Sequence, residues 1–309
     1  MKNNTTLKSN FFAYLIFGLM TAAMYGQQRP QYTQYMYNTQ AINSGYTGTQ
    51  GKLAASLLYR TQWVGIDGAP ETQSFTAHGL VKDRIGLGLT ILNDNLGASN
   101  NFEVNANFAY HIRTGQSTTL SLGLNAGLDI FNIDYSKGNI ANGLDPVFQE
   151  NLNETRPIVG AGIFYFGSKW YLGISSNNLL NSQIYNDNES TVTERKSQYY
   201  FMGGYVFDLG RSVKFKPAVL TKHVSGSPIT VDASANFLLR ERLSLGLAYR
   251  YDDAISALAG FYITDNFFLG YAYDYSLTGL ENYNDGSHEI ILTYNLEGLK
   301  KRALSPRFF

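Results

Sequence analysis

The chain has 309 residues, a formal net charge of zero at pH 7 and no cysteine. Zero net charge argues against nucleic acid as a partner, and the lack of cysteine excludes disulfides, thiol catalysis and lipoprotein-type acylation. Only 16% of the residues are charged, while tyrosine (23) and glycine (30) are abundant. This composition is typical of a membrane β-barrel, which carries aromatic residues at both interfaces.

The first residues have the pattern of a secretory signal peptide. A weakly basic start precedes an apolar core at 11–20 and small residues at 21–23. We expect cleavage after Ala23 or Gly26, so residues 1–26 form the predicted signal peptide. A membrane anchor is the alternative, but the apolar run is shorter than the roughly 20 residues that a span needs.

Residues 27–50 are rich in tyrosine, asparagine and glutamine and are too short for a domain. This segment could enter the lumen of a barrel as a plug or lie beneath it in the periplasm. The barrel itself is predicted over 51–297, followed by a periplasmic tail at 298–309.

A strict alternation of side chains carries the fold prediction. Every even position from Phe102 to Ile112 is apolar or aromatic, and the even positions of 120–130 repeat the pattern. A period of two indicates β-strands, and each run suits the roughly 9–11 residues of a tilted transmembrane strand. We expect the even residues of both runs to face the lipid.

Similar runs recur along the chain, so the predicted fold is all-β: a transmembrane antiparallel β-barrel of about 14 strands with short periplasmic turns and longer extracellular loops. The predicted strands are 52–61, 71–81, 84–93, 102–113, 118–131, 156–166, 169–177, 197–208, 212–222, 229–239, 242–251, 254–263, 266–275 and 287–296.

The connections between these strands alternate in length, which a soluble sandwich has no reason to do. The longer connections are 62–70, 94–101, 132–155, 178–196, 223–228 and 276–286, and Asp252-Asp253 is the exception. An even strand count places both mature termini on the short-turn side, in the periplasm of a Gram-negative outer membrane.

Charges of both signs fall on the inward faces of the predicted strands, where they must pair or stay hydrated. The predicted lumen charge network comprises Glu103, Asp129, Lys214, Lys216, Asp232, Arg250 and Asp274, with Glu289 beside them. The alternative is a set of rim charges in water, because a register slip of one residue inverts every face.

No catalytic or cofactor motif stands out. The four histidines are scattered without metal-ligand spacing, so we expect no metal and no cofactor. His111 with Asp129 could act as a general base and its orienting carboxylate, but a hydrogen bond inside the lumen is the favoured interpretation. Acidic residues in the Asn-rich outer loops could hold calcium, although simple solvation is favoured because no spacing matches a calcium loop.

The first outer loop resembles a known family. The run from Tyr59 to Phe75, YRTQWVGIDGAPETQSF, is similar to the signature of the PorP/SprF family of outer-membrane proteins of type IX secretion and gliding motility. Further similarity covers 31–38, 86–94, 144–148 and 305–309. The chain departs from the family at 43–48, where relatives more often carry Asn-Pro-Ala-Tyr-Ala-Gly.

The resemblance implies a role rather than a reaction. Family members associate with type IX secreted adhesins that carry a C-terminal sorting domain, and some contact periplasmic lipoproteins of the secretion machine. The protein is therefore expected in the outer membrane, in contact with its lipid. The candidate partner-binding residues lie in the signature loop and are Gln62, Trp63, Ile66, Asp67 and Pro70.

Besides partner binding, two other roles of this loop remain open. Trp63 could anchor the barrel in the aromatic girdle, or the loop could fold inward and close the lumen. At the level of function, the alternative is an outer-membrane uptake channel of fatty-acid-transporter type. That reading calls for a larger plug, an apolar lumen pocket and a lateral opening. An enzyme is the least favoured class.

Overall fold

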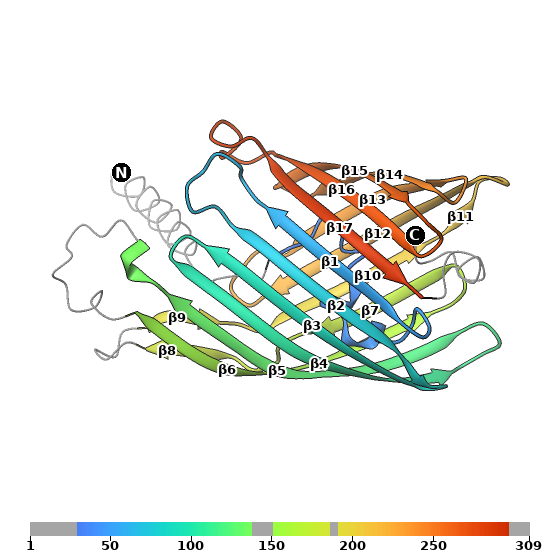
Figure 1. Ribbon diagram of the computed structural model, residues 1–309, viewed down its shortest axis with the longest axis horizontal. Coiled ribbons are helices and arrows are strands. Elements are labelled where there is room, and N and C mark those ends of the chain that lie inside the picture. The colour runs from blue at the N-terminus through green and yellow to red at the C-terminus, as the bar shows by residue number, and fades with distance from the viewer. Residues whose placement is uncertain (1–29, 138–150, 186–190, 297–309) are drawn as a thin grey trace, which may run out of the picture.

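The computed structural model describes residues 30–137, 151–185 and 191–296. Fourteen antiparallel strands form one closed barrel, because β1 pairs with β17 and β10 pairs with both β7 and β12 (Figure 1). The barrel strands are β1 (Ala54–Thr61), β2 (Glu71–Lys82), β3 (Ile85–Leu96), β4 (Ser99–Arg113), β5 (Thr119–Ile133), β6 (Leu152–Phe166), β7 (Trp170–Ser176), β10 (Gln198–Tyr205), β12 (Val213–Val224), β13 (Thr230–Leu239), β14 (Leu243–Arg250), β15 (Ala254–Tyr262), β16 (Phe267–Ser276) and β17 (Ser287–Asn295).

One strand is interrupted. β11 (Phe207–Asp208) continues β10 after Val206, and both segments pair with β12. Closure leaves no sheet edge, which is the condition for a β-structure to cross hydrocarbon. Among the described residues, no helix has the length and apolar character needed to span a bilayer.

The alternation of side chains decides which face is outside. Leu122 and Leu124 are 41% and 59% exposed on the outer wall of β5, while the inward Asn105 and Asn107 of β4 are buried. The predicted barrel, its strand count and the outward position of the even residues in these two strands are confirmed.

The two ends of the barrel differ. We call the end that carries connections 62–70 and 277–286 the long-loop end, and the end that carries 83–84 and 240–242 the short-turn end. The predicted loop 94–101 is wrong, because β3 and β4 continue and join through Gly97 and Ala98. The left-handed φ of Gly97, 56°, allows this tight turn.

The predicted loop 178–196 also contains structure of its own. β8 (Ser182–Tyr185) and β9 (Thr191–Arg195) form a separate antiparallel hairpin at the long-loop end (Figure 1). Its strands are only four and five residues long, so the hydrophobic alternation was too short to indicate them. The predicted signal peptide and the predicted tail lie outside the described residues.

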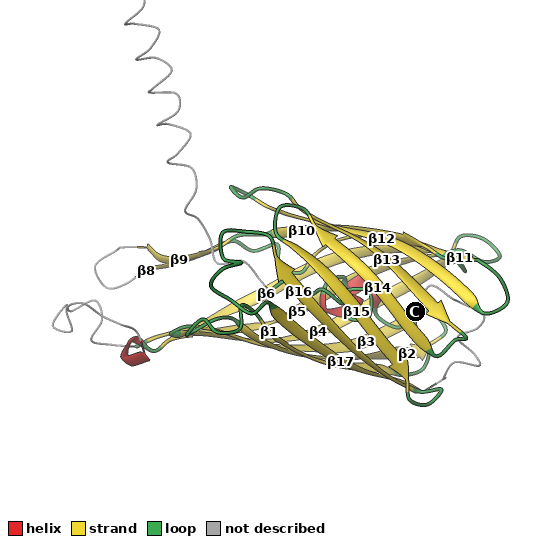
Figure 2. Ribbon diagram, turned by 90° about the horizontal axis from the view of Figure 1, so that it is seen from above, coloured by secondary structure: helices red, strands yellow, loops and turns green. Residues whose placement is uncertain are grey.

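Residues 30–50 lie inside the barrel, and we call them the plug segment. Of the two positions that the sequence allows for this segment, in the lumen or beneath it, the structure has the first. The segment forms two short turns of helix, η1 (Thr39–Ala41) and η2 (Ser44–Tyr46). Figure 2 shows helix inside the barrel, enclosed by the strands. The segment runs lengthwise: the Thr33 amide donates to Glu289 near the long-loop end, and the Gly48 amide donates to His78 near the short-turn end.

Side chains of the plug segment join those of the wall in one apolar core. Tyr46 meets Phe164 of β6 edge to face, with ring centroids 5.2 Å apart, and Tyr37 stacks on Phe268 of β16 at 4.5 Å. Such aromatic pairs add stability beyond the area that they bury. The lumen is thus packed like a protein interior.

Close backbone contact between plug and wall depends on glycine. A Cβ on Gly123 of β5 would lie 2.2 Å from the amide nitrogen of Gly45. We therefore expect Gly123→Ala to lower the free energy of unfolding by about 1–3 kcal/mol, because the plug segment must shift. Gly279→Ala is the control, since a Cβ there meets nothing within 4 Å. Denaturant titration of both purified barrels measures the difference, and equal midpoints would contradict the contact.

Candidate functional site

A buried arginine ties the wall to the plug segment at the long-loop end. Arg60 of β1 lies between Asp274 of β16 and Glu289 of β17, with N–O distances of 2.7 and 3.3 Å. The hydroxyl of Thr33 donates to Asp274, and the amides of Thr33 and Gln34 donate to Glu289 at 2.9 and 2.7 Å. We call these five residues the Arg60 cluster.

A second arginine holds the neighbouring part of the wall. The Arg250 side chain donates from Nε to Asp232 at 2.9 Å and from Nη1 to Asp253 at 3.2 Å. The side-chain amide of Gln31 also donates to Asp232. The first described residues of the plug segment are therefore held by carboxylates on β13, β16 and β17.

The opposite part of the lumen carries two carboxylates in direct register. Glu103 of β4 lies directly opposite Asp129 of β5, and the repulsion between like charges makes this arrangement unfavourable. Arg195, the last residue of β9, bridges both, with distances of 2.9 Å to Glu103 and 2.5 Å to Asp129. Arg156 of β6 adds a 2.6 Å contact to Asp129. We call these four residues the Arg195 cluster.

The two remaining residues of the predicted network lie elsewhere. Lys214 is near the start of β12, at the short-turn end, and pairs with Glu241 of the adjacent turn at 2.8 Å. Lys216 is fully buried, and its ammonium lies 5.8 Å from the centroid of the Tyr37 ring. The charges thus form separate groups instead of one network, because each arginine gathers only the carboxylates of nearby strands.

Sequence reasoning named Arg250 but missed the three other arginines that link the carboxylates, Arg60, Arg156 and Arg195. Arg60 and Arg156 occupy inward positions of alternating strands, so the period of two contained the signal for both. Arg195 could not be found in this way, because the hairpin that carries it lies within a predicted loop.

The alternative pairing of His111 with Asp129 is wrong, and the favoured interpretation, a hydrogen bond inside the lumen, is the one that the structure shows. Register places His111 opposite Ser121, near the short-turn end, whereas Asp129 lies opposite Glu103 near the other end. The Nε2 atom of His111 lies 2.9 Å from the carbonyl oxygen of Thr47. The histidine therefore contacts the plug segment, and no acid–base dyad forms here.

The signature loop 62–70 is held by its neighbours. The amide of Gln62 donates to the carbonyl of Pro70, and backbone bonds join Val64 to Gly286 and to Asp285 in the adjacent loop. The amide of Trp63 donates to the Ser287 hydroxyl at 3.2 Å. These bonds hold the loop to β17 and to the connection that precedes it.

Trp63 has a left-handed φ of 47°, a conformation that costs energy in a bulky residue and that the neighbouring bonds must stabilise. Its side chain and that of Ile66 are half-buried, and Asp67 is exposed. The Nε atom of Arg60 donates to the side-chain oxygen of Gln62 at 3.1 Å. The loop thus connects directly to the Arg60 cluster.

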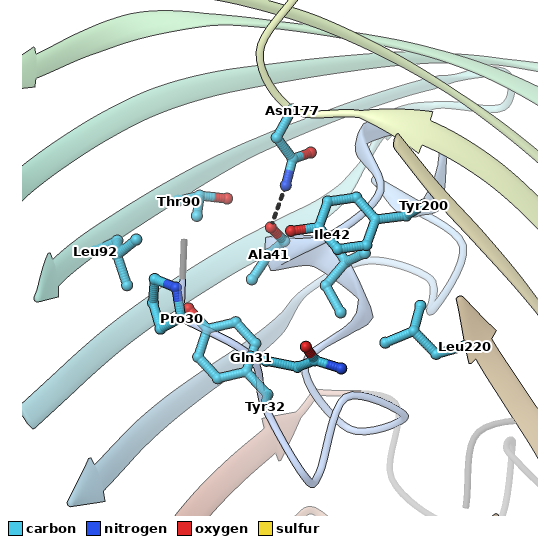
Figure 3. Close-up of a pocket in the computed structure, with 10 residues that line it drawn as sticks. All are labelled: Pro30, Gln31, Tyr32, Ala41, Ile42, Thr90, Leu92, Asn177, Tyr200 and Leu220. Atoms are coloured by element: carbon cyan, nitrogen blue, oxygen red, sulfur yellow. Dashed lines mark hydrogen bonds between the residues drawn. The ribbon is translucent and has the colours of Figure 1, made fainter. Parts of the chain in front are cut away.

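Small cavities lie between the plug segment and the barrel wall. One small cavity lies between this segment and β3, β7, β10 and β12 (Figure 3). Tyr32, Ile42 and Leu92 line it, and the Asn177 side chain donates to the carbonyl of Ala41 at 2.6 Å. In the described part of the chain, no group of three or more His, Cys, Asp or Glu side chains could hold a metal ion.

A closed antiparallel barrel with an apolar outer wall defines this chain as an outer-membrane β-barrel protein. Its fold is similar to that of the CymD monoaromatic hydrocarbon channel, with a TM-score of 0.51 and 10% identity over 85% of this chain and 91% of the other. Omp33 of Acinetobacter baumannii follows with a TM-score of 0.48 and 8% identity, over 81% of this chain and all of that one. A Pseudomonas aeruginosa FadL homologue has a TM-score of 0.47 and 10% identity, over 86% and 95%.

The sequence specifies the family more closely than the fold does. The family model of the type IX secretion system membrane protein PorP/SprF matches residues 24–294, and the chain belongs to this family. The resemblance seen in the first outer loop is thereby confirmed. The family is one of secretion-system membrane barrels and not a class of enzymes. No curated protein matches the chain.

Proposed function

We propose that the protein binds and anchors, or assists the export of, a type IX secreted adhesin through the adhesin's C-terminal sorting domain. The observation that carries this proposal is the signature loop, which is held in one conformation by β17 and the Arg60 cluster. A preorganised loop loses less conformational entropy when a partner binds. The plug segment fills the lumen, which favours a docking surface over an uptake channel.

The orientation of the barrel is part of the proposal. Long loops of outer-membrane barrels face outward and short turns face the periplasm, so the signature loop would be reached from the cell surface. Contacts with periplasmic lipoproteins of the secretion machine would then fall at the short-turn end.

The candidate contact residues divide by their place in the loop. Gln62 and Pro70 close its base through a backbone hydrogen bond of 2.9 Å. Trp63 and Ile66 supply apolar area, and Asp67 is exposed at the tip. We propose that the two apolar residues supply most of the binding energy and that Asp67 contributes to selectivity, because interfaces concentrate energy in a few buried anchors.

The test is the double variant Trp63→Ala with Ile66→Ala in cells that carry the natural adhesin. Truncating an anchor should cost about 2 kcal/mol or more. Adhesin is therefore expected to appear in the medium while the amount of barrel in the outer membrane stays normal. Ile229→Ala, an exposed apolar residue before β13 at the same end, is the matched control.

Two other outcomes would count against this site. A lower amount of barrel, with the surviving barrels still holding adhesin, would make Trp63 a membrane anchor. Full adhesin retention at normal barrel abundance would exclude the loop as the docking site.

A further inference from the structure

The short-turn end carries an arc of exposed cations on four adjacent strands. Lys52 precedes β1, Lys82 and Arg84 flank the turn between β2 and β3, and Arg113 ends β4. Within the described residues, none of the four makes an ion pair. We call them the basic arc.

Three other cations at the same end are neutralised, whereas Arg211 and Arg240 make no ion pair among the described residues. Lys169 pairs with Asp208 at 2.6 Å, and Arg242 pairs with Asp265 at 3.0 Å, as Lys214 pairs with Glu241. The pKa of Lys169 is raised because its ammonium donates a hydrogen bond to Asp208 and is attracted by that carboxylate. Among the described residues of the basic arc, Asp83 is the one acidic side chain that offsets the positive charge, so the arc is suited to an anion.

A shallow, open groove lies in the middle of the basic arc. Lys82, Asp83 and Arg84 form its polar side, and Ile85 and Tyr110 form its other side. The register of β2 and β3 shifts between Leu80 and Lys82. Such bulges re-aim side chains at barrel rims, and this one sets Lys82 beside the groove.

The groove borders the lipid-facing wall. Tyr110 lies opposite Ile85 in register and is 39% exposed on the outer face. Ile112 and Phe108 are exposed on the same face of β4. A molecule in this groove would meet cations on one side and apolar side chains on the other. These two sides match the anionic headgroup and the acyl chains of a phospholipid.

We propose that the groove binds the phosphate headgroup of an anionic phospholipid in the leaflet at the short-turn end. Lys82 and Arg84 contact the phosphodiester, while Ile85 and Tyr110 pack against the start of the acyl chains. The carboxylate of Asp83 favours a singly charged phosphodiester over a more highly charged phosphate. An acidic protein would not explain the apolar side of the groove, which opens toward the acyl chains.

The test measures binding of fluorescent phosphatidylglycerol to the mature protein in an uncharged detergent. Cations near a headgroup layer attract anionic lipid, so Lys82→Gln with Arg84→Gln should weaken binding by about tenfold or more. The matched control is Arg211→Gln with Arg240→Gln, two exposed cations of the same end that lie outside the groove. The control should change binding by less than about twofold.

Further arms identify the ligand. The charge-retaining variant Lys82→Arg with Arg84→Lys should keep its affinity, which separates loss of charge from misfolding. Inorganic phosphate should not displace the lipid, because it lacks the acyl chains; full displacement would overturn a lipid site. Unchanged binding in the glutamine variant, or equal loss in the control, would also overturn the proposal. If the glutamine variant binds the lipid unchanged, an acidic protein becomes the better occupant of the groove.

Discussion

Replacing Arg60 with methionine is expected to lower the free energy of unfolding of the barrel by about 3–5 kcal/mol. The side chain bridges Asp274 and Glu289, and all three side chains are almost completely buried. Without the guanidinium, two carboxylates remain close together and lose their ion-pair partner, although Arg250 still attracts Asp274. The loss should appear as a lower midpoint in urea titrations of the folded barrel in lipid vesicles.

An exposed pair provides the control for this variant. Arg242→Met breaks the 3.0 Å ion pair with Asp265. The Arg242 and Asp265 side chains are 47% and 36% exposed. Exposed pairs contribute about 0–1 kcal/mol, so this change should be small. Adding Asp274→Asn to Arg60→Met should restore part of the lost stability, since it removes one of the uncompensated charges. Equal effects of Arg60→Met and Arg242→Met would show that the Arg60 cluster does not support the fold.

Arg60 also joins the plug segment to the signature loop. On one side it donates to the hydroxyl of Thr33 at 3.1 Å, and on the other to Gln62 at 3.1 Å. The plug segment and the signature loop therefore share one ionic centre. We expect Arg60→Met to disturb adhesin retention as well as stability, because the base of the loop loses its support.

The strands could be predicted from the sequence because a membrane wall leaves little freedom. Outward positions must be apolar and inward positions can be polar, so a period of two persists over each strand. β2 was expected at 71–81 and extends over Glu71–Lys82; β5 was expected at 118–131 and extends over Thr119–Ile133. The faces followed from the same pattern.

The contacts across the lumen could not be predicted in the same way. Alternation predicts that Glu103 and Asp129 point inward, but which arginine reaches them depends on where the hairpin of β8 and β9 places Arg195. The plug segment has no regular periodicity, since its path is set by close backbone contacts such as that of Gly45 with Gly123. The predicted loop 94–101 is wrong because Asn and Asp, which are common in loops, here continue β3 and β4.

Removing the plug segment is expected to convert a non-conducting barrel into a conducting one. The complete protein should show little or no stable conductance in planar bilayers, because residues 30–50 fill the lumen with buried side chains such as Tyr35 and Tyr46. Eight strands enclose an interior that side chains can fill, whereas sixteen to eighteen leave an aqueous channel. A barrel of fourteen strands without its plug should therefore conduct in stable steps.

A deletion of residues 31–48 makes this test, with heat-dependent mobility on gels to show that the barrel still folds. If the deletion prevents folding, Gly86→Val with Gly123→Val provides a second route, because Cβ atoms there would lie 2.4 Å from the Thr47 carbonyl oxygen and 2.2 Å from the Gly45 amide. Either variant should raise conductance well above that of Gly279→Ala. Large stable steps from the unaltered protein would mean that the plug segment does not close the lumen, and the uptake-channel alternative would then be favoured over a docking barrel.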